Sequence, residues 1–129
     1  MAPDTSIKKV SKLTRNSRLL KVIIRSIQDK KGENILSLDL RKIDEAVADF
    51  FIVCEASSTT QVKAIADNIE EQVKTATGES PYRSEGRTAM HWVLVDYINV
   101  VIHIMLPDTR KHYNLEELWF DAPGQKIEN

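Results

Sequence analysis

The sequence has little of the residues that mark several specialised protein classes. Its 129 residues include one cysteine, four glycines and four prolines. One cysteine cannot close an intramolecular disulfide, and so few glycines and prolines exclude collagen-like and low-complexity chains. No apolar run approaches the roughly 18 residues of a membrane span, and the charged N-terminal segment lacks the apolar core of a secretory signal. We therefore expect a soluble, unprocessed chain in a reducing, cytoplasmic setting.

Apolar and charged residues are present in the proportions of a folded domain. Apolar side chains make up 42% of the chain and charged ones 29%, and the length is in the range of a single domain. No internal repeat and no linker rich in glycine, proline or serine divides the chain. The predicted organisation is a basic N-terminal arm over residues 1–10, one domain over residues 11–122 and a C-terminal tail over residues 123–129.

Charge is divided unevenly along the chain. The first 31 residues carry nine basic and two acidic side chains, a net charge of +7, whereas the remaining body carries nine basic and 17 acidic ones, a net charge of -8. Such asymmetry indicates charged partners. Four basic side chains would gather on one side of an extended first helix and are predicted to contact RNA: Lys8, Lys12, Arg15 and Arg18. The alternatives are a solvated face, a disordered tail, or pairing with carboxylates of the body.

Hydrophobic periodicity predicts two long helices and two strands in the first half of the chain. Helical spacing covers residues 11–30 and 58–77, and the second helix has a capping box from Ser58 to Gln61 and a stop at Gly78. Strand patterns cover residues 34–40 and 49–56. The second of these segments contains a continuous apolar run from Phe50 to Cys54, which favours a central position in a sheet.

The second half of the chain predicts a hairpin and short elements around it. A short edge strand is expected over residues 81–86, and two strands over residues 91–97 and 100–106 form a hairpin whose paired residue numbers sum to 197. Pro107 and Asp108 end the hairpin. A short helical turn follows over residues 115–119, opened by a capping box from Asn114 to Glu117. The element order predicts an α/β domain with a mixed, roughly five-stranded sheet and flanking helices.

The hairpin register sorts its side chains onto two different faces, because side chains alternate across a pleated strand. One face is wholly apolar and should lie beneath helices: Val93, Val95, Ile102 and Ile104. The other, which we call the mixed face, combines large apolar groups with a carboxylate and an imidazole: Trp92, Leu94, Asp96, Val101, His103 and Met105. That mixture is unusual for a core, so we expect an exposed docking surface with Trp92 as its anchor. Coverage by a helix or by a second copy of the chain is the alternative.

The residues that commonly carry catalysis form no recognisable constellation. The glycine patterns of phosphate and dinucleotide sites are missing, and the histidines share no metal-ligand spacing with one another or with Cys54. Ser57 and Ser58 could open a phosphate site at a helix N-terminus, although helix capping explains them better. We predict that the chain is not an enzyme and uses no metal or cofactor.

An ordered set of short motifs runs through most of the chain. It comprises Asp49 to Val53, Ser57 to Gln61 leading into Ala64 to Ala66, Glu85 with Gly86, Trp92 to Asp96, Val100 and Val101 with His103, and a Tyr113 to Trp119 pattern. Over nearly all of residues 33–123 this set resembles the ribosomal silencing factor family, also called the Iojap or RsfS family. Two departures concern loop geometry: Ala56 stands where glycine is usual, and Ile98-Asn99 replaces a common Gly-Asp turn. Because isoleucine is poor at positive φ, a four-residue loop closing Asp96 on Val101 is an alternative to a two-residue turn.

The resemblance implies a fold similar to nucleotidyltransferases without their catalytic motif. It also implies binding to the large ribosomal subunit through its intersubunit-face protein numbered fourteen, which obstructs joining of the small subunit and represses translation. The mixed face and Glu116 would then bind the partner, with Asp96, Asp49 and the acidic body complementing a basic ribosomal protein. The competing hypotheses are a nucleotide-binding enzyme and a general nucleic-acid module. The arm is predicted to contact ribosomal RNA, and a homodimer off the ribosome is left open.

Overall fold

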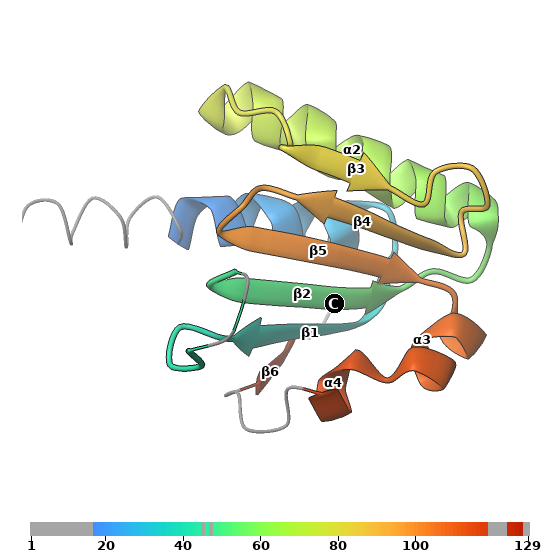
Figure 1. The fold of residues 1–129 in the computed structure, drawn as a ribbon. Coiled ribbons are helices and arrows are strands. Elements are labelled where there is room, and N and C mark those ends of the chain that lie inside the picture. The colour runs from blue at the N-terminus through green and yellow to red at the C-terminus, as the bar shows by residue number, and fades with distance from the viewer. Residues whose placement is uncertain (1–16, 45, 47, 119–123, 128–129) are drawn as a thin grey trace, which may run out of the picture.

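The computed structural model describes residues 17–44, 46, 48–118 and 124–127, and Figure 1 shows their arrangement. Within these residues, six strands form one sheet in the order β3-β4-β5-β2-β1-β6. The strands are β1 (Glu33–Asp39), β2 (Phe50–Glu55), β3 (Arg83–Glu85), β4 (Trp92–Asp96), β5 (Val100–Met105) and β6 (Gly124–Ile127). The helices are one over residues 17–29, α2 (Thr59–Thr77), α3 (Pro107–Tyr113) and α4 (Leu115–Leu118). None of these helices in the described ranges is long and apolar enough to cross a membrane.

The sheet is mixed, as predicted. Strand β2 pairs in parallel with β5, and the other neighbouring strands pair antiparallel. Strand β2 lies between β1 and β5, and its central residues are buried on both faces, which confirms the interior position that its continuous apolar run predicted. The path from β2 to β5 passes through α2, the edge strand β3, and β4, which lies between β3 and β5.

The predicted hairpin register is confirmed. Trp92 pairs with Met105 and Asp96 pairs with Val101. The wholly apolar face of the hairpin is fully buried and packs in one core with the helix over residues 17–29 and with α2. Figure 1 shows both of these helices on the same side of the sheet. These two helices therefore cover the apolar face of the hairpin.

The turn of the hairpin keeps two residues in spite of its unfavourable sequence. The Tyr97 N–H donates to the Val100 carbonyl at 2.9 Å, and the Asn99 N–H donates back to the Tyr97 carbonyl at 2.9 Å. Ile98 consequently has a φ of 72°, a left-handed conformation that β-branched side chains rarely adopt. Its own N–H donates to Asp96 Oδ1 at 2.7 Å. The four-residue loop is not needed, and the backbone at Ile98 is strained instead.

Helix α2 has the predicted ends, with one different contact. Ser58 Oγ accepts from the Gln61 N–H at 3.1 Å, and Gly78 ends the helix with a φ of 77°. The Gln61 side chain returns to Ser57 rather than to the Ser58 backbone, because its Oε1 accepts from the Ser57 N–H at 2.7 Å and from the Ser57 hydroxyl at 2.8 Å. Its Nε2 donates to the carbonyls of Lys30 and Lys31. Gln61 therefore ties α2 to the end of the preceding helix.

The prediction of a C-terminal tail over residues 123–129 is wrong for residues 124–127. Gly124–Ile127 forms β6, which pairs antiparallel with β1 from Ile35 with Ile127 to Leu38 with Gly124. This segment raises the number of described strands from the expected five to six. Four residues with little alternation carry almost no strand signal by themselves. The strand exists because the edge of β1 supplies its hydrogen-bonding partners.

The segment after the hairpin is also more helical than predicted. Pro107 ends β5 as expected, but it also occupies the start of α3, with Asp108 in the first turn, where proline and acidic residues suit a helix. The capping box proposed from Asn114 is wrong. Asn114 has a φ of 44° and ends α3, with its N–H bonded to the Arg110 carbonyl at 2.8 Å. The predicted helical turn is α4, and Trp119 lies outside the described residues.

Candidate docking face

The structure gathers the six residues of the mixed face on the side of the sheet away from the two long helices. Three come from β4 and three from β5, as the hairpin register requires. Phe51 and Val53 of β2 continue this face beside β5, because they pair in parallel with Val101 and His103. The face therefore spans the centre of the sheet.

The expectation that the whole mixed face is exposed is wrong. Met105 is fully buried and clusters with Val53 and with Leu115 of α4. Val101 is buried among Phe51 and residues of the segment between β1 and β2. Trp92 and Leu94 remain partly exposed. The alternative of a covering helix is realised at the Met105 end, and the helices α3 and α4 that make this possible were only partly predicted.

Trp92 is the centre of a cluster of aromatic rings. Its indole Nε1 donates to His103 Nδ1 at 3.0 Å. The Trp92 ring centroid lies 4.9 Å from that of Tyr113, and the His103 ring lies 4.9 Å from Phe51 in an edge-on arrangement. Tyr113 is 53% exposed and also contacts His112. Tyr113 belongs to the motif set but not to the predicted site, since only the course of α3 brings it to Trp92.

His103 is a buried base beneath this cluster, with 4% of its surface exposed. Burial lowers the pKa of His103 to about 4, although the nearby Asp96 carboxylate opposes that shift. The imidazole is therefore neutral at pH 7. Its Nδ1 accepts the indole hydrogen bond, and its Nε2 has no partner among the described residues.

Asp96 is engaged within the chain rather than directed at a partner. It is 9% exposed, and its Oδ2 accepts from Arg83 Nε at 3.1 Å. Its Oδ1 caps the hairpin turn by accepting from the Ile98 N–H. Both carboxylate oxygens are thus occupied, so the geometry favours a role in holding the turn over the direct ionic contact that the sequence predicted.

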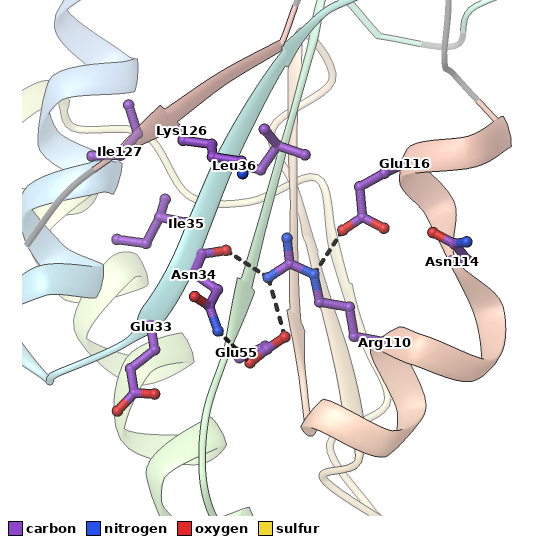
Figure 2. A pocket seen from close by; sticks show the side chains of 10 residues that line it. All are labelled: Glu33, Asn34, Ile35, Leu36, Glu55, Arg110, Asn114, Glu116, Lys126 and Ile127. Atoms are coloured by element: carbon purple, nitrogen blue, oxygen red, sulfur yellow. Dashed lines mark hydrogen bonds and ion pairs between the residues drawn. The ribbon is translucent and has the colours of Figure 1, made fainter.

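Glu116 lies in a separate groove of about 880 Å³ that no residue of the mixed face lines. Figure 2 shows the Arg110 side chain reaching across this groove from α3. Arg110 donates to Glu116 Oε1 at 2.7 Å and to the Asn34 carbonyl at 2.5 Å, and it lies 3.6 Å from Glu55 Oε1. Glu116 therefore belongs to an ionic network that fastens α3 and α4 to the start of β1 and the end of β2.

Of the predicted RNA-contacting residues, the structure describes Arg18 alone. Lys8, Lys12 and Arg15 lie outside the described residues. Arg18 is exposed and donates from Nη2 to the Ala76 carbonyl at 2.5 Å, in the last turn of α2. This contact places a cation at the negative end of the α2 helix dipole.

The metal, thiol and phosphate sites considered from the sequence are not supported by the described residues. They contain no group of three or more histidine, cysteine or acidic side chains placed to hold a metal ion. Complete burial raises the pKa of Cys54 to about 12, so its sulfur stays a thiol. The donors of Ser57 are satisfied by Gln61, so the phosphate-site hypothesis is not favoured.

Comparison with known proteins identifies the family to which the chain is similar. The model of the family described as "Ribosomal silencing factor during starvation" matches residues 13–129. A ribosomal silencing factor of Bacillus subtilis is 43% identical over 105 residues, covering 81% of this chain and 87% of that protein. A mouse protein named mitochondrial assembly of ribosomal large subunit protein 1 is 38% identical over 73 residues, 55% of this chain and 32% of that protein. A crystal structure of a Chromobacterium violaceum protein matches with a TM-score of 0.76 and 37% identity, covering 87% of this chain and 89% of that one. The chain therefore belongs to the ribosomal silencing factor family.

Proposed function

We propose that the protein binds the large ribosomal subunit in the cytoplasm and prevents the small subunit from joining. The family description supports a ribosome-directed silencing role. The name of the mouse relative links that relative to the large subunit. The contact proposed is the intersubunit-face protein numbered fourteen, and the mechanism is steric, so it needs no catalytic group.

The partly exposed aromatic pair of Trp92 and Tyr113 is the observation that carries this proposal. Most of the mixed face is sealed, yet these two rings remain accessible, 4.9 Å apart, beside the partly exposed Leu94. Large aromatic side chains next to apolar neighbours dominate the binding energy of protein interfaces. A protein surface docked on this pair would bury both rings, and the rest of the chain would then obstruct joining of the small subunit.

The charge of the chain supports a basic protein partner. The body after residue 31 carries a net charge of -8, which would accelerate association with a basic ribosomal protein by electrostatic steering. The arm, with its charge of the opposite sign, is proposed to reach ribosomal RNA. This division avoids placing the acidic body against phosphates.

Sedimentation with purified ribosomal particles tests the proposal. The native protein should co-sediment with free large subunits and not with joined ribosomes. Trp92→Ala should weaken large-subunit binding by roughly 2 kcal/mol, or about 30-fold, which is the magnitude of an interface hot spot. Tyr82→Ala is the matched control, because Tyr82 is 72% exposed and lies beside Asp96, at the other end of β4 from Trp92.

Three results would contradict the proposal. A folded Trp92→Ala protein that binds large subunits as tightly as the native chain would mean that another face docks. Equal binding of the native protein to free subunits and to joined ribosomes would exclude steric competition. If the native protein forms a concentration-dependent dimer, and Trp92→Ala abolishes this dimer without any effect on subunit binding, the aromatic pair would be assigned to self-association instead.

A further inference from the structure

We propose that His103 is a positioning residue, which holds the indole of Trp92 in its docking orientation and does not itself touch the partner. The proposal rests on the docking role proposed for Trp92 and deepens it. The sequence alone predicts that His103 binds the partner directly, but only 4% of its surface is exposed. A partner therefore reaches Trp92 and not the imidazole below it.

The strand pairing sets the two rings together. His103 pairs with Leu94 and Met105 pairs with Trp92, so Trp92 and His103 are diagonal neighbours on one face of the hairpin. Aromatic side chains can reach one another across this diagonal. The result is the 3.0 Å hydrogen bond from Trp92 Nε1 to His103 Nδ1, which uses the only polar atom of the indole.

The imidazole is itself fixed as an acceptor. Because Nδ1 accepts from the indole, the proton of the neutral ring sits on Nε2. The Phe51 ring packs against the imidazole at 4.9 Å with an interplanar angle of 64°. Burial keeps the pKa of His103 near 4, so the acceptor is present throughout the physiological pH range.

The unpartnered Nε2 argues that stability alone does not explain His103. A buried N–H without a hydrogen-bond partner destabilises a fold, and an apolar side chain of similar volume would avoid that penalty. What a histidine supplies here, and a leucine would not, is the acceptor for Trp92. With Tyr113 also packed against it at 4.9 Å, the indole is held before the partner arrives, which lowers the entropy lost on binding.

Two substitutions separate positioning from packing. His103→Leu removes the acceptor, whereas His103→Asn offers an amide oxygen close to the position of Nδ1. The readouts are large-subunit affinity and the indole N–H resonance of Trp92 in a ¹H–¹⁵N spectrum, which Trp92→Phe identifies by its disappearance. His103→Leu should retain the native melting temperature or exceed it, weaken affinity about five- to tenfold and accelerate exchange of the indole proton with water. His103→Asn should restore much of the native affinity and much of the slow exchange of the indole proton.

A double-mutant cycle provides the sharpest test, because Trp92→Phe keeps an aromatic ring but cannot donate a hydrogen bond. In that background His103→Leu should have no further effect on affinity. An undiminished effect in that background, or an unchanged indole resonance in the folded His103→Leu protein, would overturn the proposal.

If His103→Leu does not fold, the indole resonance of His103→Asn decides, and rapid exchange of the indole proton in that variant would likewise overturn the proposal. If the native protein does not bind large subunits, the proposed function fails, and the resonance alone then supports or overturns the positioning role.

Discussion

His103 couples the stability of the fold to pH through a single buried side chain. Its pKa in the folded protein is about 4, compared with an ordinary value of 6.5. Between these values the unfolded chain binds a proton that the folded chain does not bind. The free energy of unfolding should therefore fall as the pH drops from about 6.5 to about 4 and show no further loss from this group below that. Over this pH range the free energy of unfolding should fall by roughly 3 kcal/mol in total.

Urea unfolding at several pH values between 7.5 and 4.2 measures this effect. His103→Leu cannot titrate, so its stability should change much less over the same range. Arg41 and Lys63, respectively, lower the pKa of Asp39 and Asp67 below 3.8 by hydrogen bonding, so the stability that these carboxylates add is lost only at more acidic pH. Parallel loss of stability in the native and His103→Leu proteins would show that another group is responsible.

The strained turn residue predicts a stabilising substitution. Ile98 is 59% exposed and has a φ of 72°, so replacing it with glycine removes strain without opening a cavity. Ile98→Gly should raise the free energy of unfolding by about 1 kcal/mol, because part of the relief is offset by the greater freedom of glycine in the unfolded chain. Ile98→Val retains the branched Cβ and should give no gain in the same denaturant titration. Equal stabilities of the glycine and valine variants would contradict the assignment of strain to this residue.

At the scale of elements, Arg110 determines how firmly α3 and α4 attach to the sheet. Its side chain is 13% exposed and pairs with Glu55 and Glu116 across the groove. Arg110→Ala would leave two partly buried carboxylates without their cation and should reduce the free energy of unfolding by about 2 kcal/mol. Lys111→Ala, at the exposed neighbouring position, should change it by less than about 0.5 kcal/mol. Similar urea midpoints for the two variants would indicate that the network adds little.

At the scale of the whole molecule, the split of charge predicts how binding depends on salt. Deleting residues 1–12 should weaken large-subunit binding. It should also reduce the slope of log affinity against log salt by up to about 0.9 for each phosphate that the arm no longer neutralises. Replacing Lys8, Lys9 and Lys12 with glutamine in the full-length chain should reproduce the smaller slope without shortening the arm. A truncated protein with the native affinity and slope would mean that the arm makes no RNA contact.

The elements that local patterns could predict are those whose signals lie within a few neighbouring residues. The period-two alternation of the hairpin determined its register and therefore which side chains share a face, and these pairings are found. Ser58 and Gly78 marked the ends of α2 because helix caps are local interactions. The sequence also placed Trp92 and His103 on one face, but it predicted that both are exposed to a partner, whereas only 4% of the His103 surface is exposed.

The tertiary structure decided what covers that face and which groups meet. Leu115 buries Met105, β6 exists only as a partner of β1, and Arg110 of α3 contacts β1 and β2, which are distant from it in sequence. Each contact joins segments that have no local signal for one another, so no periodic pattern could reveal them. The charge split by itself indicated charged partners, and the ordered motifs carried the resemblance to the ribosomal silencing factor family. Packing decided that Trp92 stays partly exposed while His103 is buried, because burial depends on neighbours that only the folded chain brings together.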